Sequence, residues 1–187
     1  MSEVGDGPLA RGVWLGLGAN LGDRVANLGS GLDALLDGGV AIDAVSAVYD
    51  TPPWGALAGG EPQPRFANIA AAGRCAFDAH ELLALCKRVE AVAGRDFDAP
   101  RNSARPLDVD VLLVEGEMLS GPDLEIPHPR MHERAFVLVP LAEIASALLH
   151  PGRDRSVSEL LTGVDRAGVE LLEPAGWWRG GGVAGRS

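Results

Sequence analysis

The chain has 187 residues, of which 47% are hydrophobic and 22% charged, so it is long and apolar enough to fold as one globular domain. Its formal net charge of −10 at pH 7 excludes a general role in coating nucleic acid, because a polyphosphate surface repels an acidic protein. A local cluster of arginines could still bind a small anion. Two cysteines, Cys75 and Cys86, form no C-x-x-C motif and are expected to be reduced thiols in a cytoplasmic protein.

We expect a single domain over residues 1–187, with a loose leader over residues 1–10 and a Gly-rich tail over residues 174–187. The leader is acidic and lacks the basic and apolar regions of a signal peptide. Trp177 and Trp178 lie in the tail, and we expect this pair to pack back on the body of the protein.

Hydrophobic spacing predicts two β-α-β halves followed by a helix. The predicted elements are, in chain order, a strand over 13–17, a helix that starts near Asn20 and Asp23 and carries Leu28, Leu32, Leu35 and Leu36, a strand over 40–49, a strand over 66–74, a helix over 78–93 capped by Asp78, a strand over 107–114, and a helix near 135–148 broken early by Pro140. Two such halves predict an α+β fold, the ferredoxin-like βαβ-βαβ sandwich with helices packed on a sheet.

Two carboxylates lie in the segment with the clearest strand character. Side chains alternate along a strand, so the apolar residues 107, 109, 111 and 113 are expected on one face and Asp108 and Asp110 on the other, about 6–7 Å apart. Two buried carboxylates repel each other, and a hard cation such as Mg²⁺ relieves that repulsion. Two solvent-facing aspartates on an edge strand remain an alternative.

Three arginines precede this strand in a loop, namely Arg95, Arg101 and Arg105. A guanidinium carries a fixed charge and binds phosphate oxygens through two hydrogen bonds, so arginines beside a carboxylate pair favour phosphoryl or pyrophosphoryl transfer. The alternative is surface pairing of these arginines with Asp96 and Asp98. The chain has no P-loop motif, and the glycines of residues 16–22 are expected to serve a tight turn from strand to helix.

Aromatic and amide side chains indicate a second kind of binding surface. Phe66 and Phe136 could stack on a flat heteroaromatic ring while Asn68 recognises its polar edge, although packing of both phenylalanines in the core is the alternative. His128 lies close to Arg130 and Arg134 in the sequence, and we interpret this histidine as a further phosphate contact.

Five motifs in this order resemble the 6-hydroxymethyl-7,8-dihydropterin pyrophosphokinase (HPPK) family over residues 14 to about 148. They are Gly-Leu-Gly-Ala-Asn-Leu-Gly-Asp, Val-Tyr-Asp-Thr-Pro-Pro-Trp-Gly, Phe-Ala-Asn, Arg-Pro-Leu-Asp-Val-Asp-Val-Leu, and Ile-Pro-His-Pro-Arg-Met followed by Arg-Ala-Phe-Val. In that family ATP donates a pyrophosphoryl group to the hydroxymethyl group of the pterin and AMP leaves. The resemblance therefore implies an ATP-dependent diphosphokinase of folate biosynthesis.

The resemblance also implies a set of site residues. Asp108 and Asp110 would hold two Mg²⁺ ions. The residues implied as catalytic are Arg95, Arg105, Asp108 and Asp110; those implied for ATP are Glu90, Arg95, Arg101, Arg105, His128 and Arg134; those implied for the pterin are Thr51, Pro52, Pro53, Trp54, Phe66, Asn68 and Phe136.

The implied partners are ATP and 6-hydroxymethyl-7,8-dihydropterin, with no nucleic acid and no membrane, and the oligomeric state is open. One alternative is a homologue that binds pterin or nucleotide without turnover, because Phe97 and residues 102–104 depart from the family pattern. Another is a ferredoxin-like module that binds a metal or an effector. This last alternative gives no reason for Phe66, Asn68 and Phe136 to accompany the aspartate pair.

Overall fold

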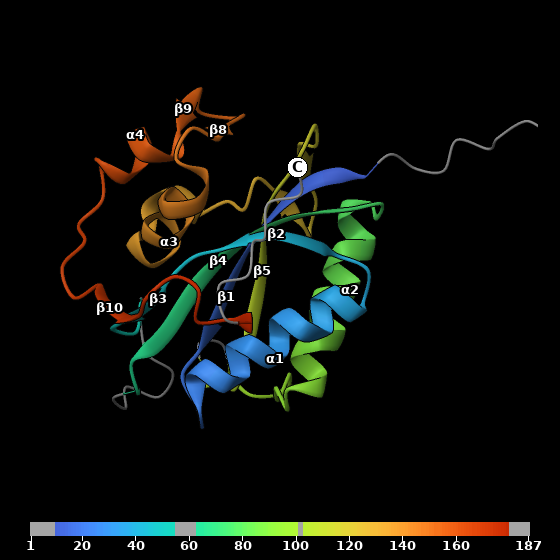
Figure 1. Ribbon diagram of the computed structural model, residues 1–187. Coiled ribbons are helices and arrows are strands. Elements are labelled where there is room, and N and C mark those ends of the chain that lie inside the picture. The colour runs from blue at the N-terminus through green and yellow to red at the C-terminus, as the bar shows by residue number, and fades with distance from the viewer. Residues whose placement is uncertain (1–9, 55–62, 101–102, 180–187) are drawn as a thin grey trace, which may run out of the picture.

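A six-stranded antiparallel sheet lies at the centre of the molecule, with helices on both faces (Figure 1). The computed structural model describes residues 10–54, 63–100 and 103–179. The strands of this sheet are β1 (Arg11–Ala19), β2 (Ala41–Val45), β3 (Val48–Thr51), β4 (Phe66–Cys75), β5 (Asp108–Val114) and β10 (Glu170–Glu173). The helices are α1 (Arg24–Asp37), α2 (Ala79–Val92), α3 (Ala135–Ala145) and α4 (Val157–Leu161).

The order of the strands confirms the predicted α+β fold. The sheet runs β10-β3-β4-β1-β5, and β2 also pairs with β4. In each β-α-β half a helix leads from one strand to another that is not its neighbour, because β4 lies between β1 and β3, and β1 lies between β4 and β5. This arrangement is the split βαβ topology of the ferredoxin-like sandwich.

The strand predicted over residues 40–49 is two strands, which is a correction to the sequence analysis. The ladder stops at Ser46 and Ala47, where backbone groups find other partners. The Ala47 N–H donates to Glu143 Oε2 on α3 at 3.0 Å, and the Ala70 N–H donates to Ser46 Oγ at 3.0 Å. These side chains replace the strand partners, so the chain bends between β2 and β3.

Two helix boundaries differ in their outcome. The predicted cap of α2 is confirmed, since Asp78 accepts from the Glu81 N–H at 2.8 Å and Glu81 reaches back to the Asp78 N–H. In α1 the cap is Asp23, and the helix begins at Arg24, whereas Asn20 serves the site described below.

Pro140 does not break α3, contrary to the prediction. The proline lies inside the helix and is buried, and the helix continues to Ala145. Proline removes one backbone hydrogen bond, but burial of Leu138 and Leu141 against the sheet offsets this loss.

Two apolar cores share the sheet. The first lies under α1 and α2, and the second lies under α3 and α4. The pairing of β1 with β5 contains a bulge, because Trp14 pairs with Leu113 while Leu15 pairs with Val111. Leu112 is the extra residue, so Leu113 belongs to the second core and not to the face of Leu107 and Val109, as alternation along the strand had predicted.

The chain contains elements before and after α3 that the sequence analysis did not predict. Before α3 there are a two-stranded ribbon of β6 (Leu119–Ser120) and β7 (Glu125–Ile126) and a 3₁₀ helix, Met131–Glu133. After α3 there are a second ribbon of β8 (Leu149–His150) and β9 (Arg155–Ser156), then α4 and β10. Strands of two to four residues carry too little periodicity to be recognised.

The tryptophan pair packs back on the body, as expected. Trp177 Nε1 donates to the Ser46 carbonyl at 2.9 Å, and Trp178 Nε1 donates to Asp33 Oδ1 on α1 at 3.2 Å. Most of the predicted leader, residues 1–9, and the end of the predicted tail, residues 180–187, lie outside the described residues. Within the described residues, no helix is both long enough and apolar enough to span a membrane.

Candidate active site

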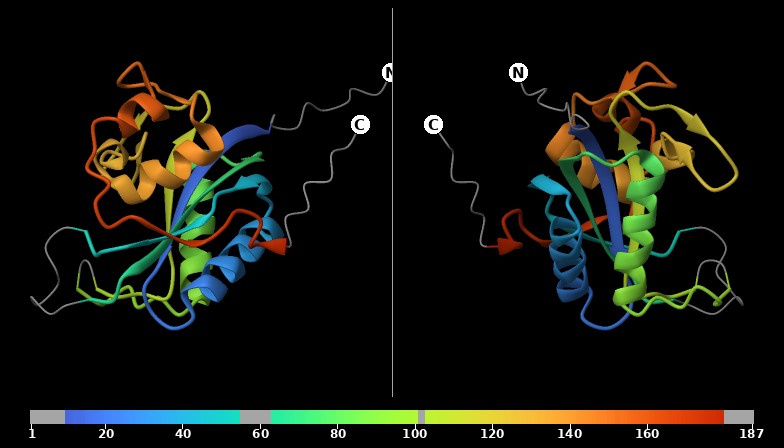
Figure 2. Two further views of the ribbon diagram at one scale, coloured as in Figure 1. Left: turned by 60° about the vertical axis from the view of Figure 1, so that its left-hand side comes forward. Right: turned by 90° about the vertical axis from the view of Figure 1, so that its right-hand side faces the viewer.

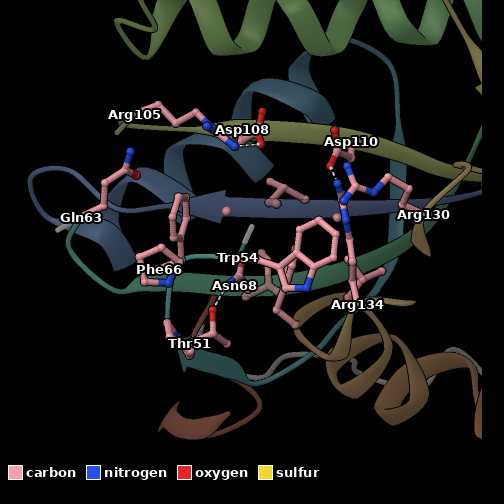
Figure 3. Close-up of a pocket in the computed structure, with 18 residues that line it drawn as sticks. Thr51, Trp54, Gln63, Phe66, Asn68, Arg105, Asp108, Asp110, Arg130 and Arg134 are labelled. Atoms are coloured by element: carbon pink, nitrogen blue, oxygen red, sulfur yellow. Dashed lines mark hydrogen bonds and ion pairs between the residues drawn. The ribbon is translucent and has the colours of Figure 1, made fainter. Parts of the chain in front are cut away.

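A cavity of about 330 Å³ opens between the sheet and the first turn of α3 (Figure 3). Four segments far apart in the sequence supply its walls. Asp108 and Asp110 come from β5, Phe66 and Asn68 from β4, residues 51–54 from the end of β3, and Arg130, Arg134 and Phe136 from the segment 130–136 that leads into α3. The fold therefore brings the carboxylate pair, the arginines and the aromatic residues to one place.

The two carboxylates share the cavity but differ in their partners. Asp108 Oδ2 accepts from Arg105 Nη2 at 2.7 Å, and Asp108 Oδ1 pairs with Arg95. Asp110 has weaker partners, since its Oδ2 lies 3.8 Å from Arg134 Nη1 and 4.0 Å from His128 Nε2.

This difference in partners separates the pKa values of the two carboxyls. Burial alone raises the pKa of Asp108, but Arg105 and Arg95 outweigh burial and hold it below its usual range. Burial and the neighbouring charge of Asp108 raise the pKa of Asp110 to about 6. Burial, and then the positive charge of Arg134, lower the pKa of His128 to about 4, so this imidazole is neutral at pH 7.

Glu90 lies beneath the site and does not line the cavity. Its side chain is fully buried, its Oε1 accepts from the Val109 N–H at 2.8 Å, and the same oxygen lies 2.7 Å from Arg95 Nη1. Lys87 Nζ also donates to this carboxylate, at 2.9 Å and 3.0 Å. These contacts fix Arg95 and β5, and the expected contact between Glu90 and ATP stays a prediction.

Asn20 connects the end of β1 to the loop that enters β5, a role that the sequence analysis missed. Its side-chain oxygen accepts from the Arg105 N–H at 2.7 Å, and its own N–H donates to the Arg105 carbonyl at 3.1 Å. The side chain is 2% exposed. Arg105 is thereby held with its guanidinium 5.5 Å from the ring of Phe66.

The opposite wall is aromatic and amide-bearing. Asn68 Nδ2 donates to Thr51 Oγ1 at 2.7 Å, so the side-chain oxygen of Asn68 is held beside Gly18. Phe66 and Phe136 are half-buried and line the cavity, and the rings of Phe136 and Trp54 meet edge to face with centroids 6.4 Å apart.

Several lining residues were not singled out as site residues in the sequence analysis. One is Arg130, whose guanidinium lies 4.2 Å from the centroid of the Trp54 ring, beside the predicted Arg134 at 4.9 Å from the same ring. Gly16 and Gly18 lie within β1 and form the floor, so they do not serve the predicted turn; the turn uses Gly22, whose φ is +65°. Glycines two apart in a strand were the signal for an uncovered face.

The structure brings most of the predicted site residues to the cavity. Those that line it are Thr51, Pro52, Pro53, Trp54, Phe66, Asn68, Arg105, Asp108, Asp110, Arg134 and Phe136. Arg95 and His128 lie just behind it, each against one of the two aspartates. Arg101 lies outside the described residues.

The carboxylate pair suits a cation that is coordinated partly by these two side chains and partly by the phosphates of a bound substrate. Among the described residues, no group of three or more His, Cys, Asp and Glu side chains forms a closed metal site. Mg²⁺ is usually held through one or two carboxylates, with phosphates and water completing its coordination. The raised pKa of Asp110 marks a carboxylate whose charge lacks compensation, so Asp108 and Asp110 fit such a cation.

Comparison with known proteins identifies the family. Residues 14–146 match the model of 7,8-dihydro-6-hydroxymethylpterin-pyrophosphokinase (HPPK). The chain is 42% identical over 162 residues to the 2-amino-4-hydroxy-6-hydroxymethyldihydropteridine pyrophosphokinase of Methylorubrum extorquens, and this match covers 86% of the chain and 98% of the relative. The enzyme of the same name from Bacillus subtilis is 38% identical over 133 residues, which are 71% of the chain and 77% of that relative.

Longer proteins contain a similar region. The mitochondrial folate synthesis bifunctional protein of Arabidopsis thaliana is 34% identical over 182 residues, and the match covers 88% of the chain but only 32% of that protein. A solved Plasmodium falciparum HPPK-DHPS structure superposes with a TM-score of 0.66 at 14% identity, over 85% of the chain and 46% of the solved chain. At this identity the superposition supports the fold alone.

Proposed function

We propose, because the chain belongs to the 7,8-dihydro-6-hydroxymethylpterin-pyrophosphokinase family, that it transfers a pyrophosphoryl group from ATP to 6-hydroxymethyl-7,8-dihydropterin in folate biosynthesis. The pterin hydroxyl oxygen attacks the β-phosphorus, the bond from that phosphorus to the α,β-bridging oxygen breaks, AMP leaves, and the hydroxyl proton is released. One observation carries the proposal: a single cavity joins a carboxylate pair and arginines to an aromatic, amide-bearing wall.

The residues divide between the two substrates. Phe66 and Phe136 would stack on the pterin ring while Asn68 and the backbone of residues 51–54 recognise its polar edge. Arg105 and Arg134 would bind phosphate oxygens, and Arg101 would join them as a third. His128, neutral at pH 7, can accept or donate one hydrogen bond without adding charge.

Asp108 and Asp110 would hold Mg²⁺, as two ions together with the ATP phosphates. The ions would neutralise charge that develops on the phosphates during transfer. Arg95 and Glu90 act behind this pair. Arg95 contacts Asp108, and Glu90 holds Arg95, so these two residues position the first carboxylate.

The remaining expectations belong to the same proposal. The chain acts as one domain with ATP and the pterin as its partners, without nucleic acid, in the cytoplasm. Both cysteines, Cys75 and Cys86, are free and buried, which agrees with a reducing compartment.

The test is the nucleotide product. ATP is mixed with the protein, with and without 6-hydroxymethyl-7,8-dihydropterin and with and without Mg²⁺, and products are separated. AMP that forms only with both additions is the expected result. ADP would mean ordinary phosphoryl transfer, and pterin binding without any nucleotide product would identify a homologue that binds without turnover.

Substitution of the second carboxylate tests the metal assignment. Asp110→Ala is expected to reduce turnover by at least about 10²-fold, because one Mg²⁺ ligand is lost. Asp123→Ala, an exposed aspartate in a bend, is the matched control and should retain activity. Near wild-type activity of Asp110→Ala would show that Asp110 does not hold the metal.

A further inference from the structure

The segment of residues 167–173, which we call the strap, crosses the edge of the sheet behind the wall formed by residues 51–54. It lies beyond residue 146, where the family match ends. Figure 2 shows the red C-terminal segment passing from the side of α4 across the sheet to α1. Within the strap, β10 pairs with β3, so that Glu170 lies opposite Asp50 and Leu171 lies opposite Tyr49.

One contact joins the strap directly to the wall. Gly168 has φ of +77°, and a Cβ built on it would lie 3.2 Å from Pro52 Cδ and 3.3 Å from Pro52 Cγ. The glycine backbone therefore packs closely against a proline that lines the cavity from its other side. Any larger side chain at residue 168 would have to move Pro52 or the strap.

Arg65 connects the strap to β3 and to the start of β4, the two strands that carry Thr51 and Phe66. Its Nη2 donates to the Gly168 carbonyl at 2.8 Å and to the Asp50 carbonyl at 3.2 Å, and its Nε pairs with the Asp50 carboxylate. Arg65 precedes Phe66, and Asp50 precedes Thr51, so each charged residue is next to a cavity residue. Arg24 on α1 also pairs with Asp50 and donates to the Arg65 carbonyl at 2.9 Å.

We propose that the strap, through Gly168 and Arg65, sets the position of Pro52 and its neighbours and thereby determines affinity for the pterin, although no strap residue lines the cavity. This inference rests on the proposed function, which supplies the pterin as the ligand. Gly168 and Arg65 are positioning residues, because they act through Pro52, Thr51 and Phe66. Arg105, Asp108 and Asp110 lie across the cavity from Thr51, so the strap should affect binding of the pterin much more than binding of ATP (Figure 3).

The experiment compares two glycine variants of the full chain. Gly168→Ala adds a methyl group against Pro52, whereas Gly116→Ala imposes the same kind of backbone strain at φ of +73° with no atom within 4 Å of the added Cβ. Binding of 6-hydroxymethylpterin is measured by fluorescence in the presence of α,β-methylene-ATP, which cannot be cleaved at the reacting bond. Binding of the nucleotide analogue alone is measured by calorimetry.

Gly168→Ala is expected to raise the Kd of the pterin about tenfold, because sub-ångström shifts at a preorganised wall are costly, and to leave the Kd of the nucleotide analogue within about twofold of wild type. Gly116→Ala should change neither Kd. A pterin Kd that is equal in the two variants, or equal losses of pterin and nucleotide binding in Gly168→Ala, would overturn the proposal.

A second variant and a readout without ligand keep the test decisive. Arg65→Lys keeps a positive charge beside Asp50 but loses the forked bonds to two carbonyls, and it should raise the pterin Kd about threefold. Hydrogen exchange in the peptide spanning Tyr49–Trp54 should be faster in Gly168→Ala than in Gly116→Ala. If the wild-type protein binds no pterin, the proposed function fails, and the claim that the strap determines pterin affinity fails with it. If hydrogen exchange in the peptide Tyr49–Trp54 is unchanged in Gly168→Ala, the strap does not position this wall.

Discussion

Asp108 and Asp110 are two residues apart on one strand, yet their surroundings shift the pKa values of the two carboxyls in opposite directions. Two arginines contact the carboxylate of Asp108. The nearest positive group to the carboxylate of Asp110 is Arg134, at 3.8 Å. The pKa of Asp110 is about 6, so the folded protein binds a proton there more tightly than the unfolded chain does. A site that keeps an uncompensated carboxylate ready for a cation therefore loses some stability when the cation is absent.

This cost predicts how Asp110→Asn changes the stability of the metal-free protein. The unfolded carboxyl has a pKa near 3.8 and the folded one about 6, so ionisation of Asp110 destabilises the fold increasingly as the pH rises from about 4 to about 6. Asp110→Asn should unfold at a higher temperature than wild type at pH 8, and the difference should shrink at pH 5. Thermal unfolding in EDTA measures it, with Asp123→Asn as the control; a lower unfolding temperature of Asp110→Asn at pH 8 would contradict the argument.

Gly18 predicts a separate effect on the pterin side. A Cβ built on Gly18 lies 2.8 Å from Asn68 Oδ1, whereas one on Gly16, in the same strand and cavity, lies at an ordinary 3.5 Å from Leu112. Gly18→Ala must move the amide that is proposed to recognise the pterin. We expect the KM for the pterin to rise about tenfold in Gly18→Ala and much less in Gly16→Ala, measured by AMP release. Equal KM values in the two variants would show that Asn68 does not recognise the pterin.

At the scale of elements, the site depends on how strands and loops are joined at their ends. Asn20 connects β1 to the loop before β5, and Glu90 on α2 connects β5 to Arg95. Neither residue lines the cavity, but each holds an arginine that contacts Asp108.

Asn20→Ala tests this connection. The substitution leaves the Arg105 N–H without its partner, which should cost about 1–3 kcal/mol of unfolding free energy and raise the KM for ATP. Urea unfolding and AMP release at varied ATP give the two quantities. Asn27→Ala is the matched control, because it removes a surface bond to the Leu21 carbonyl in the same turn. An unchanged KM for ATP in Asn20→Ala would show that Arg105 does not need this contact.

For the whole molecule, one sheet serves two cores. Leu32 in α1 and Leu138 in α3 are both fully buried but lie on opposite faces of the sheet. Because the strands contribute to both cores, loss of either should unfold both. The site lies on the face that α3 covers, and the carboxylates reach it from the strand at the edge.

Leu32→Ala and Leu138→Ala test this coupling. Each should lower the unfolding free energy by about 2–5 kcal/mol while keeping one cooperative transition. Far-ultraviolet and near-ultraviolet circular dichroism should give the same midpoint in each variant. Two separated transitions in either variant would mean that the cores unfold independently.

Local patterns in the sequence were sufficient for much of this protein. Leucine spacing predicts α1, Asp78 predicts the start of α2, and alternation in β5 predicts a shared side for Asp108 and Asp110. These features depend on neighbours a few residues away, so a pattern in the chain is enough to recognise them. The same is true of the five motifs, whose order indicates the family.

Only the tertiary structure decided the features that depend on partners far along the chain. The break between β2 and β3 depends on Glu143, the burial of Glu90 depends on Arg95 and Val109, and the bulge that redirects Leu113 depends on pairing with β1. The strap behind Pro52 joins residues more than a hundred positions apart. No local pattern encodes such contacts, because their energy comes from hydrogen bonds and packing that exist only when the whole sheet has formed.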